Sequence, residues 1–118
     1  MALVELSFAL IEDTVTLAGH RPVDERAPPS QPGDVFGFWL ELRDRSDQCL
    51  YRHPVDVPPR ATGADGVRRA EFLAQAPVLP GARSVHLLHR KLGGSGSPPE
   101  TLFHIEAEAL WRPLPALK

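Results

Sequence analysis

The chain contains a single cysteine, Cys49, among its 118 residues. One thiol cannot form a disulfide within the chain, so nothing in the sequence requires an oxidising compartment. We expect a cytoplasmic protein whose fold needs no covalent cross-link, because a domain of this length can bury a sufficient core. Free cysteine is among the most buried residue types, and we interpret Cys49 as a buried structural residue.

Basic excess and long apolar runs are also missing. The net charge is −2, whereas nucleic-acid-binding domains usually carry a clustered excess of lysine and arginine. The apolar stretch near the N-terminus has no basic leader and is interrupted by Glu5, Glu12 and Asp13. These features argue against a signal peptide or a membrane span. We therefore predict neither nucleic acid nor a membrane as a partner.

Short motifs of catalysis and cofactor binding are absent from the sequence. It contains no HExxH, CxxC or GxSxG pattern. The glycine-rich stretch 92–97 precedes two prolines instead of a helix, which argues against a phosphate-binding loop there. We therefore expect no catalytic residues, no metal and no cofactor. Abundant arginine, proline and alanine are typical of a GC-rich coding sequence, from which we infer a bacterial source.

What the sequence does contain is strict apolar alternation, clearest in the predicted hairpin from Asp34 to Tyr51. Alternation with a period of two is typical of a half-buried β-strand. It assigns four large apolar residues to a core face: Phe36, Phe38, Leu40 and Leu42. Trp39 falls on the opposite face, beside Gly37.

The rest of the chain has the pattern of short strands separated by turn residues. We predict strands over residues 3–10, 14–18, 55–57, 69–76, 84–90 and 101–111. The last of these contains strong helix formers, yet its alternation favours a strand. The segment from Gly19 to Gly33 carries four prolines and two glycines, which predicts a surface crossover between two sheets.

These strands predict an all-β protein, a two-sheet Greek-key immunoglobulin-like sandwich of about seven strands. Residues 1–112 would form one domain and residues 113–118 a C-terminal tail. The stretches FWLELRDRSDQCLYR and VLPGARSVHLLHRK resemble the central hairpin and the E-to-F turn of bacterial immunoglobulin-like or fibronectin type III-like modules. The paired cysteines of antibody domains are missing. The resemblance implies a fold and no particular activity.

The outward Trp39 leads to our functional hypothesis, since a large aromatic beside a glycine is typical of a binding surface. The candidate binding residues are Trp39, Gly37, His86, Leu88 and His104. We predict a non-enzymatic protein–protein interaction or assembly module, a small soluble adaptor or accessory subunit. It would bind a protein partner or itself through this outer face or through an unpaired edge strand. The alternative is that the 19–33 loop or the C-terminal tail covers Trp39.

Two other functions remain open from the sequence. A carbohydrate-binding module would need a second exposed aromatic near Trp39, for which Tyr51 and Trp111 are the candidates. A metal-dependent enzyme would use His86, His104 and Glu106, provided that the last two strands are neighbours in the right register.

Overall fold

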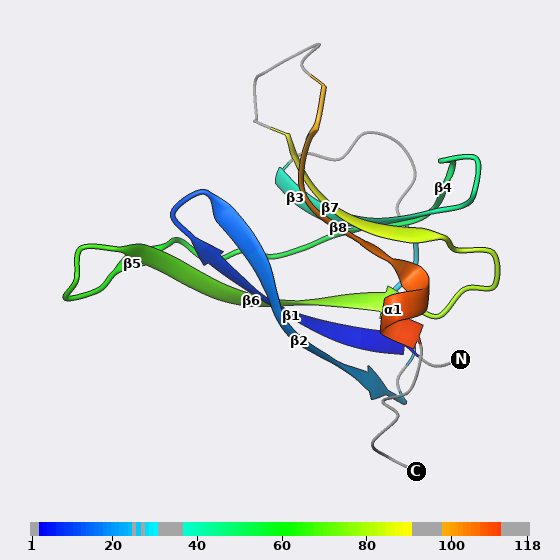
Figure 1. The fold of residues 1–118 in the computed structure, drawn as a ribbon, viewed down its shortest axis with the longest axis horizontal. Helices are drawn as coiled ribbons and strands as arrows, with labels where there is room; N and C mark the ends of the chain where they lie inside the picture. Colours follow the sequence, from blue (N-terminus) through cyan, green and yellow to red (C-terminus); the bar gives the residue numbers. More distant parts are fainter. Residues whose placement is uncertain (1–2, 25, 27, 31–36, 91–97, 112–118) are drawn as a thin grey trace.

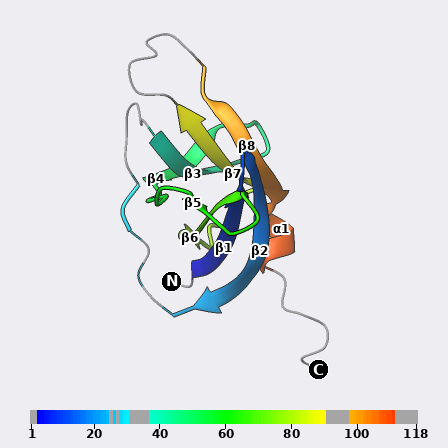
Figure 2. The same ribbon diagram turned by 90° about the vertical axis from the view of Figure 1, so that its left-hand side faces the viewer.

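The computed structural model describes residues 3–24, 26, 28–30, 37–90 and 98–111. Within these residues the chain forms two antiparallel four-stranded sheets, ordered β2-β1-β6-β5 and β4-β3-β7-β8. The elements are β1 (Leu3–Ile11), β2 (Thr14–Val23), β3 (Gly37–Arg43), β4 (Cys49–Pro54), β5 (Ala61–Thr62), β6 (Arg68–Pro77), β7 (Ser84–Arg90), β8 (Glu100–Glu106) and α1 (Ala107–Trp111). The sheets stack on each other in both views (Figures 1 and 2), which confirms an all-β sandwich-like architecture.

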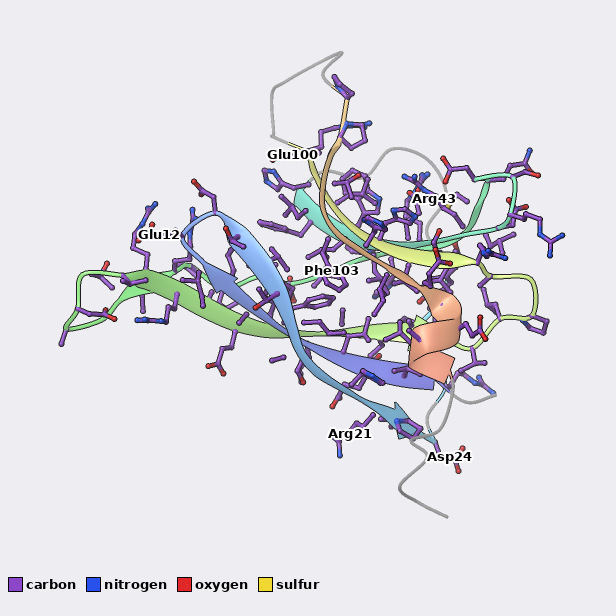
Figure 3. The ribbon with its side chains drawn as sticks, in the orientation of Figure 1. Glu12, Arg21, Asp24, Arg43, Glu100 and Phe103 are labelled. Atoms are coloured by element: carbon purple, nitrogen blue, oxygen red, sulfur yellow. The ribbon has the colours of Figure 1, made fainter. Side chains whose placement is uncertain are left out.

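The first sheet turns its apolar residues toward the second sheet. Along β1 and β6 every second side chain is buried, as the alternation predicts. Phe8 lies opposite Phe72 in the register, and their rings stack with centroids 5.3 Å apart. The Phe8 ring also meets the edge of Phe103 on β8, again at 5.3 Å, and Figure 3 shows Phe103 pointing between the sheets. Phe8 therefore joins the two layers.

The central hairpin supplies the core of the second sheet. Leu40 and Leu42 are completely buried, which confirms the core face predicted for them. Phe38 is only partly buried and packs against the ring of His89, with centroids 4.4 Å apart. Phe36 lies outside the described residues.

Two predicted boundaries in the first sheet are wrong. The second strand continues to Val23, so the long connection begins later than Gly19. Pro22 is tolerated there because β2 is an edge strand, where a missing backbone donor can face away from the sheet. A short strand at Ala61–Thr62 replaces the one predicted at 55–57, which brings the number of strands in the described residues to eight.

The C-terminal segment 101–111 combines the two structures that its sequence allowed. The alternation holds through Glu106, and the remaining residues form one helical turn, so the strand prediction is wrong from Ala107 onward. Ala107 and Leu110, three residues apart, are both buried, and the amide of Ala107 donates to the carbonyl of Arg83. In the described part of the chain, no helix has the length and apolar character needed to cross a membrane.

Replacing Phe8 with alanine should lower the free energy of unfolding by about 3–5 kcal/mol, because the change opens a cavity between the sheets. Urea denaturation monitored by circular dichroism measures the loss. Leu50→Ala is the matched control, since Leu50 is 41% exposed and should change stability by less than about 0.5 kcal/mol. Equal losses for the two variants would contradict the role of Phe8 as the link between layers.

Candidate binding sites

Trp39 lies on the outer face of the second sheet, as predicted, but it is buried. Its side chain is 3% exposed and packs with Leu88, its cross-strand neighbour, which is 1% exposed. The guanidinium of Arg90 lies 5.8 Å from the centroid of the Trp39 ring. The expectation of an exposed apolar patch around Trp39 and Leu88 is therefore wrong, because both side chains are buried.

Part of the proline-rich connection is anchored beside this sheet. The hydroxyl of Tyr51 donates to the carbonyl of Pro28 at 2.7 Å, and the amide of Arg52 donates to the hydroxyl of Ser30 at 3.1 Å. Burial raises the pKa of the Tyr51 phenol. Residues 31–36 and 112–118, which include the other candidates for covering Trp39, lie outside the described residues.

The polar centre of this outer face is Glu41, which is 6% exposed. Its carboxylate accepts hydrogen bonds from the indole of Trp39 at 3.1 Å, from Arg43 at 2.7 Å and from Arg52 at 3.0 Å. Burial alone would raise the pKa of this carboxyl, but the hydrogen bonds from Arg43, Trp39 and Arg52 outweigh it and the pKa is lowered. Glu41 thus fixes the position of Trp39 and two arginines.

His86 and His104 come together as the predicted neighbouring strands require. They lie opposite each other in β7 and β8, and their rings stack with centroids 5.8 Å apart. Nε2 of His86 lies 2.8 Å from the hydroxyl of Ser84, while its Nδ1 is buried without a hydrogen-bond partner in the described residues. Burial, followed by the charge of Arg43, lowers the pKa of His86.

The metal triad suggested by the sequence does not form. Glu106 pairs with Arg83 at 3.3 Å instead of turning toward the two histidines. Across the described residues, no three histidine, cysteine or carboxylate side chains are arranged to hold a metal ion.

An aromatic platform for a sugar ring is not formed by the described side chains either. Trp39 and Tyr51 are 3% and 5% exposed, so neither face is open to a ligand. The side chain of Trp111 lies outside the described residues.

Gly37, the remaining candidate on this surface, begins β3 with a φ of 80°, a left-handed conformation that glycine adopts without strain.

Cys49 is exposed, so its interpretation as a buried residue is wrong. The physical reason is a bulge in the pairing of β3 with β4, where Leu42 lies opposite Tyr51 and Arg43 opposite Cys49. Leu50 is the extra residue of this bulge and is also exposed.

The feature that sequence reasoning did not locate is an open edge on β6. β5 pairs only with Arg68 and Arg69 of this ten-residue strand. The carbonyl of Arg68 accepts from the amide of Glu12 on the β1 side. Because backbone groups alternate in direction along a strand, those of Glu71, Leu73 and Gln75 point to the opposite edge. Beyond Arg69, no described strand pairs with β6 along that edge.

The described chain that runs past this edge does not form a further strand on it. Pro54 ends β4, and the connection from β4 to β5 contains Pro58 and Pro59; none of these prolines has a backbone amide hydrogen. The amide of Val55 is used on β3, where it donates to the carbonyl of Phe38 at 2.9 Å. The connection therefore packs beside β6 without completing its hydrogen bonding.

A cleft of about 220 Å³ lies between this connection and the strand. We call it the β6 edge groove. Its two walls are residues 53–56, which comprise the end of β4 and the start of the connection, and residues 73–75 of β6, with Glu5 and Leu40 completing the lining. Leu73 is 57% exposed, the most exposed large apolar side chain among the described residues. An open strand edge and an exposed leucine thus occur at the same place.

Comparison of the chain with protein-family models, with curated proteins and with solved structures gives no match. The candidate sites are therefore assessed on their geometry alone.

Replacing Glu41 with glutamine should destabilise the protein by about 1–3 kcal/mol at neutral pH, because the partly buried guanidinium groups of Arg43 and Arg52 lose a charged hydrogen-bond acceptor. The pKa of Glu41 is lowered in the folded state, so its contribution is present above the ordinary glutamate pKa. The contribution is lost as the pH falls through the lowered value. The difference in unfolding free energy between wild type and Glu41→Gln should therefore shrink in acid.

Urea titrations at a series of pH values measure this difference. Glu100→Gln is the matched control, because Glu100 is an exposed carboxylate on β8 (Figure 3) and its replacement should change little at any pH. A Glu41→Gln penalty that stays constant into acid would show that Glu41 does not act through its charge.

Proposed function

We propose that this protein is a non-enzymatic interaction module that binds an extended protein segment by strand addition at the β6 edge groove. The observation that carries the proposal is the length mismatch between β5, which has two residues, and β6, which has ten. The backbone groups of Glu71, Leu73 and Gln75 point toward the edge at which no described strand pairs with them. An extended segment is the partner whose hydrogen-bonding groups match such an edge.

The energetics of this edge favour a peptide over a compact ligand. Each backbone hydrogen bond contributes about 1 kcal/mol net, so a few of them give only modest affinity. Burial of the exposed Leu73 side chain against the partner adds an apolar contribution of about 1.5–3 kcal/mol. The hydrogen bonds would align the partner strand, and burial of Leu73 would add an apolar contribution of similar size.

The adaptor or assembly role expected from the sequence is retained in this proposal, but its location changes. Trp39 and Leu88, the apolar residues expected to make the contact on the outer face of the second sheet, are buried. The open edge is the other surface that we considered from the sequence. It accommodates a protein partner or, in principle, a second copy of this chain.

We further propose that the sandwich is a variant of the immunoglobulin-like arrangement. The order β4-β3-β7-β8 is the order of strands C′, C, F and G in such domains. The first sheet departs from it, because β1, not β2, lies beside β6. An immunoglobulin-like sheet would have the second strand there, so the first two strands are exchanged.

Replacing Leu73 with proline should abolish strand addition while preserving the fold. Proline removes the amide hydrogen that faces the open edge and leaves the hydrogen bonds between β6 and β1 intact. Peptides selected on the wild-type protein from a displayed library of random extended sequences supply the ligands. Their affinity, measured by fluorescence anisotropy, should fall at least about tenfold in Leu73→Pro.

The matched control is Leu73→Val, which retains both the amide hydrogen and an apolar side chain and should bind within about threefold of wild type. Circular dichroism and the melting temperature of each variant show whether the fold is retained. Selected peptides that bind Leu73→Pro as tightly as wild type would refute strand addition at this edge. Strand addition would also be refuted if the library yields no binding peptide and the protein remains monomeric.

A further inference from the structure

We infer that the strand accepted at the β6 edge groove comes from another protein and carries a basic residue opposite Glu71 and an apolar residue opposite Leu73. This inference rests on the proposed function, since it specifies the partner of the same site. Charge complementarity along the edge is its main support.

Glu71 is the carboxylate of β6 that the fold leaves without a counter-ion. The two arginines at the start of β6 form ion pairs with other carboxylates, Arg68 with Glu12 at 3.3 Å and Arg69 with Asp65 at 2.9 Å. No ion pair of Glu71 occurs within the described residues, and its partner in the register with β1 is the neutral Ala9. The Glu71 side chain is exposed, so its charge is available to a neighbouring strand.

The wall that faces β6 has the same charge. Asp56 lines the groove from the β4–β5 connection, is exposed, and has no ion pair in the described part of the chain. Glu5 lines the groove as well, but it is paired with Arg21 at 3.0 Å. Lysine and arginine are absent from the described lining residues. One uncompensated carboxylate, Asp56, thus lines the groove, and a second, Glu71, lies beside it on β6, a distribution of charge that favours a basic segment.

Strand geometry fixes where the basic residue would lie. In an antiparallel pair, directly opposed side chains have Cβ atoms about 5 Å apart and share one face of the sheet. Glu71, Leu73 and Gln75 share the outer face of β6, because they lie two residues apart. The matching partner thus has a basic, an apolar and a polar residue at alternate positions.

Pairing with a second copy of this chain satisfies these requirements less well. An antiparallel β6–β6 pair centred on Leu73 brings the two leucines together, which is favourable. It also places Glu71 of each copy opposite Gln75 of the other and leaves both carboxylates without a cation. A basic strand from a different protein compensates Glu71 directly, so we assign the groove to that class of partner.

A charge-reversal experiment tests this assignment. The probe is an extended peptide with a central leucine and a lysine two residues to each side, so that a lysine lies opposite Glu71 in either strand direction. The matched peptide has glutamate in place of both lysines. Fluorescence anisotropy should show the lysine peptide binding wild type about fivefold more tightly than the glutamate peptide at low salt. The preference should diminish as the salt concentration rises.

The Glu71→Lys variant should reverse the preference, so that the glutamate peptide becomes the tighter ligand. Asp24→Lys is the matched control, because it makes the same charge change beyond the end of β2 (Figure 3), with β1 and β2 between it and the groove. It should leave the preference for the lysine peptide in place.

The outcomes separate this inference from the proposed function. Equal binding of both peptides to wild type, with loss of both in Leu73→Pro, overturns the basic partner and leaves strand addition standing. Sedimentation shows whether the protein dimerises. A dimer that is lost in Leu73→Pro and is not dissociated by the lysine peptide identifies a second copy as the partner and overturns the inference. Retention of lysine-peptide binding in Leu73→Pro overturns the proposed function itself.

Discussion

The shortage of backbone donors between β4 and β5 determines how the first sheet ends. Pro54 at the end of β4 and Pro58 and Pro59 after it provide no amide hydrogen, and the amide of Val55 is used on β3. The connection can therefore close the side of the sandwich only with side chains, and Val55 and Val57 pack against the core. The core is sealed while one edge of β6 keeps its hydrogen-bonding capacity. The candidate binding site follows from this local constraint on the chain.

Packing between the sheets makes such an open edge compatible with a stable fold. β6 is held by its full-length pairing with β1 and by the stacking of Phe72 on Phe8, whose ring also contacts Phe103. None of these interactions uses the edge that faces the groove. The second sheet is secured on its outer face by the hydrogen bonds of Glu41 to Trp39 and two arginines. Exposure of Leu73 thus costs the fold little, and residues at the edge can change without loss of the core.

Local alternation in the sequence predicts the strands and the core well, and it predicts longer-range contacts poorly. Leu40, Leu42 and the strand 84–90 are found as expected, because a period of two reports which face of a strand is buried. The same period placed Trp39 on the outer face but could not indicate its burial. Burial there depends on residues far away in the sequence. The bulge that exposes Cys49 is likewise a property of the pairing of two strands and leaves no local signal.

The β6 edge illustrates why the candidate site needed the structure. Each of its components is visible in the sequence: a strand with Leu73 on its polar face, Glu71 two residues before it, and prolines between residues 54 and 59. Their meaning depends on the strand order, which brings the proline-containing connection beside β6 and gives β5 only two pairing residues. A polar face interrupted by one exposed leucine is unremarkable on a closed sheet. Beside unpaired backbone groups and an uncompensated carboxylate, the same leucine becomes the apolar contact of a site for a basic strand.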